Sequence, residues 1–199
     1  MTREALAPIV LDPEQEALRL WQGAERAHGR AGDDLVALCE ALELGTRAAQ
    51  ILAVERLQEV RRELPATVAA LLDHPPPEVD PWRDVVHLPK TLRFAEVVDL
   101  LSGEELECIT PHLHHGWEDR KFSCRRSRRL AHQAAGFALT EDERTRLMVL
   151  AAYRNRLFET PPPVQVDPIA ILDAFPELRR LVERLRAGGS RNEHAGQAG

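Results

Sequence analysis

The chain has 199 residues, of which 44% are hydrophobic and 29% charged, and its formal net charge is −6, a globular composition with enough apolar material for a core. No stretch approaches the ~18 consecutive apolar residues of a membrane span, and the first ten residues lack the pattern of a secretory signal. Three scattered cysteines, an odd number, argue against a disulfide scaffold, so we expect free thiols and a cytoplasmic protein.

Five local signals predict helix starts along the chain. In an Asp-Pro pair, the aspartate can accept hydrogen bonds from free amides of the first turn, and the proline takes the first helical position, where its missing N–H costs nothing. A hydroxyl residue followed three positions later by glutamate has the spacing of a capping box. The predicted starts are Asp12-Pro13, Asp80-Pro81, Ser102 with Glu105, Thr140 with Glu143, and Asp167-Pro168.

Apolar residues recur at helical intervals between these signals, as in the series from Ile51 to Leu64 and from Leu172 to Leu185. No alternating strand pattern of useful length occurs. The sequence therefore predicts an all-α fold, a compact multi-helix bundle that is helical from Asp12 to Leu185 apart from breaks at two proline-rich joints.

The two joints each contain three consecutive prolines, which exclude helix and favour a stiff extended spacer. After Leu185 the chain is rich in glycine and polar residues and has too little apolar surface to fold, so we expect disorder there. The predicted organisation is an acidic helical N-terminal portion at 1–74, a joint at 75–81, a helical portion with a basic patch at 82–187, including the second joint at 161–168, and a disordered tail at 188–199.

A possible DNA-binding motif lies within residues 33–62. Its small and apolar positions have spacings that resemble the helix-turn-helix of DNA-binding regulators, with glycine at the turn. Residues 37–63 hold four arginines and five glutamates, however, and DNA binding depends largely on neutralising phosphates. The sequence favours an ordinary helical hairpin here, with the DNA reader as the alternative. The motif positions are Ala41, Leu44, Gly45, Ile51 and Val54, and the groove-facing residues would be Arg47, Gln50 and Arg56.

A second cluster joins thiols and imidazoles, which are the preferred ligands of zinc. Its members lack the paired C-x₂-C or H-x₃-H knuckles of zinc sites. We therefore predict no bound metal and no cofactor, and expect less than stoichiometric zinc. The weak candidate ligands are Cys108, His112, His114, His115 and Cys124.

The strongest functional signal is a basic block in which six of the ten residues at 120–129 are cationic. By contrast, residues 1–80 hold 8 basic and 15 acidic residues, a net charge of −7. A dense cationic run can hold phosphates or carboxylates, and on a helix Arg125, Arg128 and Arg129 would share a face. The predicted binding residues, with Phe122 available for stacking, are Arg120, Lys121, Phe122, Arg125, Arg126, Arg128 and Arg129.

Catalysis has weaker support in the sequence. Arg126 or Arg128 together with His132 loosely resembles the Arg/His pairs of some all-helical ribonucleases, but no phosphate loop, nucleophile elbow or paired-carboxylate signature occurs. We expect a non-enzymatic binding or regulatory protein whose partner is nucleic acid, held without strong sequence preference. The alternative is an assembly adaptor that docks an acidic protein surface, on another protein or on a second copy, through oppositely charged faces; a helical ribonuclease is less favoured.

Overall fold

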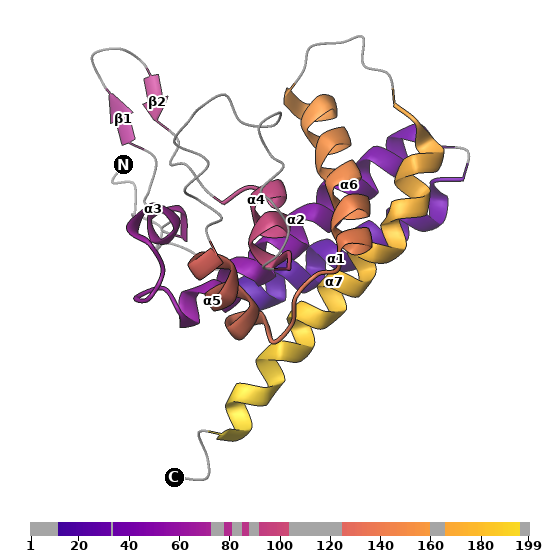
Figure 1. Cartoon of the computed structure of the whole chain (residues 1–199). Coiled ribbons are helices and arrows are strands. Elements are labelled where there is room, and N and C mark those ends of the chain that lie inside the picture. Colours follow the sequence, from indigo (N-terminus) through magenta and orange to yellow (C-terminus); the bar gives the residue numbers. More distant parts are fainter. Residues whose placement is uncertain are drawn as a thin grey trace, which may run out of the picture.

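The computed structural model describes residues 12–32, 34–72, 78–80, 85–87, 92–103, 125–159 and 166–195. As predicted, the fold is all-α: within these residues, helices make up almost all of the regular structure (Figure 1). Along the chain the elements are α1 (Pro13–Arg30), α2 (Leu35–Glu59), α3 (Ala66–Ala69), the 3₁₀ turn η1 (Ala70–Leu72), β1 (Glu78–Asp80), β2 (Val85–His87), α4 (Phe94–Leu101), α5 (Arg125–Ala135), α6 (Glu141–Glu159) and α7 (Pro168–Ala195).

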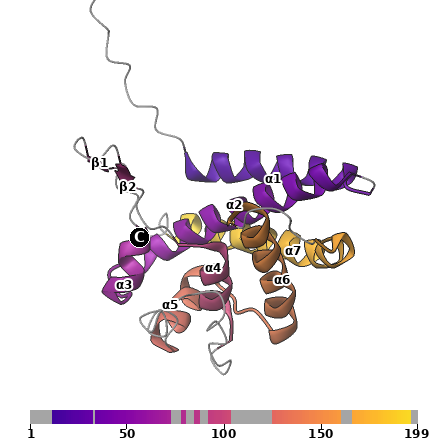
Figure 2. The ribbon, with the colours of Figure 1, turned by 90° about the horizontal axis from the view of Figure 1, so that it is seen from above.

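Helix α2 is the centre of the bundle. It packs against α1, α4, α5, α6 and α7, and it is buried on most sides, which is why its apolar residues do not follow a single stripe. Seen from above, α1 lies on one side of α2, while α4, α5 and α6 lie on the other (Figure 2). Helix α7 runs beside α2 and extends past the rest of the bundle at its C-terminal end (Figure 1). One hydrophobic cluster extends from Ala17 in α1 to Leu185 in α7.

The helix-turn-helix interpretation is wrong. Gly45 and the other positions that suggested the motif lie within one uninterrupted helix, α2, so there is neither a turn nor a hairpin at Gly45. The hairpin in this region is formed instead by α1 and α2, with its bend between Arg30 and Leu35. Gln50 donates to the backbone oxygen of Leu92, so it serves packing between segments and does not face a DNA groove.

Gly45 is glycine for reasons of packing. A Cβ atom at this position would lie 2.8 Å from Cδ2 of Leu178 in α7 and 3.5 Å from Trp21 in α1. The absence of a side chain thus allows three helices to approach closely. The adjacent Thr46 is fully buried, and its hydroxyl donates to the carbonyl of Leu42 at 2.8 Å, which satisfies its polar group inside the helix.

Three of the five predicted helix starts are confirmed. Asp12 caps α1 by accepting from the amide of Glu14 at 3.0 Å, and Asp167 caps α7 by accepting from the amide of Ile169 at 3.0 Å. At the start of α6, the Thr140 amide donates to Glu143 at 2.8 Å and the Glu143 amide donates back to the Thr140 hydroxyl at 3.3 Å. These two bonds form the predicted capping box.

The predicted helix start at Asp80-Pro81 is wrong, because Asp80 is the last residue of strand β1. This strand pairs antiparallel with β2, with Val79 opposite Val86 and Asp80 opposite Val85. The valines are β-branched and favour extended backbone, and the pairing of the two short strands outweighs the local Asp-Pro signal.

The helix predicted to start after Ser102 falls on residues 104 onward, outside the described part of the chain, so the structure shows only the surroundings of Ser102. Ser102 is the residue that follows α4, and its hydroxyl donates to the carbonyl of Val98 at 2.6 Å. The rest of that predicted capping box lies at 104–124, outside the described residues, as do both proline tracts, at 73–77 and 160–165. Helix α7 continues to Ala195, within the segment for which the sequence predicted disorder. None of the described helices is long and apolar enough to cross a membrane.

Candidate nucleic-acid interface

Helix α5 carries the described part of the basic block and has two distinct faces. Arg125, Arg126 and Arg129 are exposed, whereas Ser127, Leu130, Ala131 and Ala135 are buried against the bundle. Successive residues turn by about 100° in an α-helix, so the three exposed arginines lie within an arc of about 100°. Helix α5 contains no acidic residue, so the charged side chains on its outer face are all cationic.

Arg128 belongs to the inner face, which corrects the prediction that it presents its charge beside Arg125 and Arg129. Its side chain is only 4% exposed, and Nη1 donates to the carbonyl oxygen of Gly103 at 3.4 Å. The position is three residues after Arg125, and it turns toward the end of α4 because that side of α5 packs on α4. In the described part of the basic block, the exposed arginines are thus Arg125, Arg126 and Arg129.

His132 also faces the end of α4. Its Nε2 lies 2.8 Å from the carbonyl oxygen of Ser102, one residue past the helix. Arg128 and His132 thus both contact backbone carbonyls of the two residues that follow α4, and these hydrogen bonds join α5 to this end of α4. In the pair that resembles a ribonuclease Arg/His pair, Arg128 is therefore buried. The side chains of Arg128 and His132 each contact a backbone carbonyl.

Arg126 joins α5 to a second helix end. Its Nη2 donates to the carbonyl oxygen of Glu63 at 3.3 Å, in the turn that follows α2. This contact spans 63 residues of sequence, so no local pattern could have revealed it. Arg61 and Arg62 occupy the same turn and are both exposed. The sequence reading missed these two arginines because they are separated from the basic block along the chain.

A buried ion pair joins α6 to α4, the helix on which one side of α5 packs. Nη2 of Arg144 in α6 donates to Oδ1 of Asp99 in α4 at 3.0 Å, and the two side chains are 9% and 5% exposed. The neighbouring segment is also tied to α4, because the Leu139 amide donates to the Leu101 carbonyl at 2.7 Å and the Gly103 amide donates to the Leu139 carbonyl at 3.2 Å. These contacts join α6 to α4, which is one of the helices against which α5 packs.

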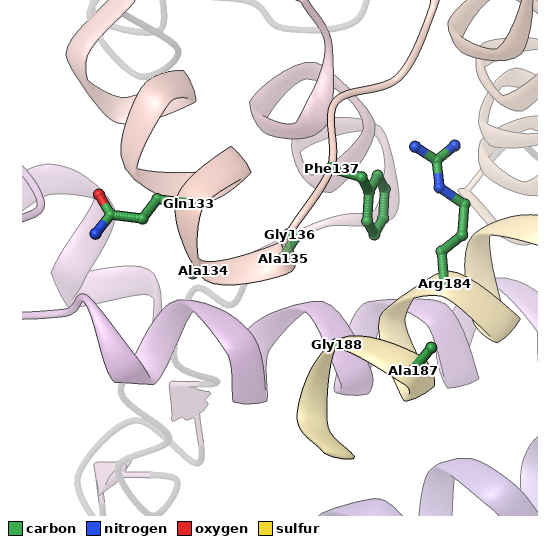
Figure 3. A pocket seen from close by; sticks show the side chains of 8 residues that line it. All are labelled: Gln133, Ala134, Ala135, Gly136, Phe137, Arg184, Ala187 and Gly188. Carbon is green, nitrogen blue, oxygen red and sulfur yellow. The ribbon is translucent and has the colours of Figure 1, made fainter. Parts of the chain in front are cut away.

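A pocket of about 320 Å³ lies between the end of α5 and helix α7 (Figure 3). The Arg184 guanidinium is stacked 3.9 Å from the centre of the Phe137 ring, while Gln133 points away from both. The charged group of Arg184 is also bonded to Glu143 at 2.8 Å and to the carbonyl of Ala138 at 3.0 Å. Among the described residues that line this pocket, Arg184 is the only one with a titratable side chain, so they provide no acid/base pair.

Burial shifts the pKa of two further side chains in the described part of the bundle, His28 in α1 and Cys39 in α2. Burial lowers the pKa of His28, with a smaller effect of Arg179 in the same direction and an opposing effect of Glu25. Burial raises the pKa of the Cys39 thiol, which keeps it protonated and weakly nucleophilic. Neither environment activates a catalytic group.

The remaining predicted site residues lie outside the described part of the chain. These are Arg120, Lys121 and Phe122 of the basic block and the five weak candidates for metal binding, Cys108, His112, His114, His115 and Cys124. Among the described residues, no group of three or more His, Cys, Asp or Glu side chains could hold a metal ion.

Comparison with known proteins gives no relative from which a function could be transferred. No protein-family model matches the chain, and searches of curated proteins and of solved structures also find no match. The interpretation of α5 therefore depends on its own chemistry.

Proposed function

We propose that this protein binds nucleic acid, without strong sequence preference, through the exposed face of α5. The observation that supports this is the gathering of Arg125, Arg126 and Arg129 on one arc of a helix without acidic residues, in a chain whose net charge is −6. Guanidinium groups form charge-assisted, often bidentate hydrogen bonds with phosphate oxygens. Contacts to phosphates position a protein on nucleic acid but do not read the sequence of bases.

The number of phosphate contacts determines the salt dependence of binding. On duplex DNA each contact contributes about −0.9 to the slope of log affinity against log salt. Three contacts then predict a slope of about −2.7, a loss of about forty-fold in affinity between about 50 and 200 mM salt. Each contact made in addition, for example by Arg120 or Lys121, increases this loss by a further factor of about 3.5.

The test is fluorescence anisotropy with a labelled duplex of mixed sequence across this range of salt. The double variant Arg125→Ala/Arg129→Ala should lower the affinity at about 50 mM salt by roughly two orders of magnitude and make the slope shallower by about 1.8. The matched control is Arg26→Ala/Arg30→Ala on α1, which removes two exposed arginines at the same spacing. This control should bind like the wild type, with an unchanged helical signal by circular dichroism.

The same experiment separates nucleic acid from the alternative partner, an acidic protein surface. A protein interface with an apolar centre weakens far less between these salt concentrations than a set of phosphate contacts does. If the wild-type protein binds neither duplex DNA nor single-stranded RNA at low salt, the nucleic-acid proposal is refuted. Docking of a carboxylate-rich protein would then be the better explanation of the exposed arginines.

A further inference from the structure

The turn after α2 places two more exposed arginines, Arg61 and Arg62, beside α5. Helix α2 ends at Glu59, and residues 60–64 continue in a tight turn in which the Glu63 amide donates to the Val60 carbonyl at 2.9 Å. Within this turn Val60 and Leu64 are buried, while Arg61, Arg62 and Glu63 are exposed. The two apolar residues anchor the turn in the core and leave the arginines on the surface.

The bond from Arg126 to Glu63 establishes that this turn and α5 are neighbours. The 3.3 Å distance joins Nη2 of Arg126 to the backbone oxygen of the residue that directly follows Arg62. Because consecutive Cα atoms are about 3.8 Å apart, Arg62 begins one residue step from the point that Arg126 contacts. Helices α2 and α5 also pack directly on each other, and both views place α5 beside the C-terminal end of α2 (Figures 1 and 2).

The charge on this combined surface is strongly positive. Residues 60–64 and α5 together hold five exposed arginines and one exposed acidic residue, Glu63. A duplex carries one phosphate charge per ~1.7 Å of its axis, so a strand that crosses α5 also offers phosphates to an adjoining turn. Arg126 donates to a carbonyl near the end of α2, and Arg61 and Arg62 add two exposed cationic side chains at the same border.

We propose that the phosphate-binding surface crosses from α5 onto the turn after α2, where Arg61 and Arg62 contact the same nucleic acid as Arg125, Arg126 and Arg129. This inference extends the proposed function of α5 and rests on it. With five contacts in place of three, the expected slope for duplex DNA becomes about −4.5, and the loss between about 50 and 200 mM salt becomes about 500-fold.

The decisive measurement is the salt slope of Arg62→Ala with the same labelled duplex. If Arg62 contacts a phosphate, the slope becomes shallower by about 0.9, and the effect is the same for duplexes of different sequence. Arg62→Lys keeps the charge and should retain the wild-type slope. Arg26→Ala is the matched single control, since Arg26 is exposed. It belongs to α1, and this helix lies on the opposite side of α2 from α5 (Figure 2).

The possible outcomes distinguish this inference from the function on which it rests. If Arg125→Ala/Arg129→Ala changes the slope but Arg62→Ala does not, the extension onto the turn is refuted and the α5 site stands. An affinity that falls in Arg62→Ala with an unchanged slope also refutes it, because the residue then acts through structure. If the wild type does not bind, both proposals fail together.

Discussion

Replacing Asp99 by asparagine tests how much the buried ion pair between α4 and α6 contributes to the stability of the bundle. Asp99 lies in α4 and Arg144 in α6, and the two residues are 4% and 8% exposed. Asparagine has nearly the same shape as aspartate but no charge. The change therefore leaves the Arg144 guanidinium in the interior without its anionic partner, while altering the packing very little.

We expect a large loss in the free energy of unfolding, because the Arg144 guanidinium that remains charged has little access to water. Breaking a buried pair by removing one partner costs about 3–5 kcal/mol, whereas a surface ion pair contributes about 0–1 kcal/mol. The asparagine oxygen still accepts a hydrogen bond from Arg144, so we expect a value near 3 kcal/mol. For a domain of this size, each kcal/mol shifts Tm by about 2–4 °C, which predicts a decrease of about 6–12 °C.

Urea unfolding followed by far-UV circular dichroism measures this cost. The control is Glu43→Gln, which removes the partner of Arg154 in a pair with the same 3.0 Å distance but with side chains 29% and 21% exposed. We expect this control to lose about 1 kcal/mol or less. A loss for Asp99→Asn no greater than that of Glu43→Gln would refute the argument, because it would show that the Arg144 charge is not confined by burial.

Two further changes test how α1 and α2 pack against α7. Replacing His28 by Phe keeps the stacking on Phe175, now at 4.0 Å, but removes the titration. Burial lowers the folded-state pKa of His28 below its unfolded value of about 6.5, so the unfolded state binds more protons and wild-type stability should fall as pH decreases below about 6.5. Urea unfolding at several pH values should show a weaker decline in the variant; equal declines would contradict the assignment to His28. Gly45→Ala should cost about 1–3 kcal/mol through overpacking, whereas Gly29→Ala, with no atom within 4 Å of its new Cβ, should be neutral or stabilising.

The parts of the fold that could be predicted from sequence are those fixed by short-range chemistry. Asp12, Thr140 and Asp167 cap helices through bonds to amides two or three residues away, so the relevant partners stand next to them in the sequence. Asp80 carries the same local signal, but strand pairing with Val85 decides its conformation. A local pattern therefore predicts a helix start only where no competing partner lies farther along the chain.

Gly45 shows the same limit in the interior of the bundle. A glycine between apolar residues fits the turn of a helix-turn-helix and also fits a close contact between packed helices. The difference is decided by Leu178, which lies more than a hundred residues later and would be 2.8 Å from an added Cβ. Sequence spacing alone does not contain this information, whereas in the structure α2 is continuous through Gly45 and packs there against α7.

The basic block combines two physical roles that its composition does not separate. Helical periodicity groups Arg128 with Arg125, but only the packing of α4 determines that Arg128 turns inward, where it contacts the Gly103 carbonyl. The density of cations in the sequence thus overestimates the phosphate contacts available on α5. Conversely, the run at 120–129 does not include Arg61 and Arg62, which the fold places beside α5 in the turn after α2. In the proposed complex with nucleic acid, the salt slope would depend on the exposed arginines and not on the sequence run, so its value would measure how the fold divides these arginines between structural contacts and phosphate contacts.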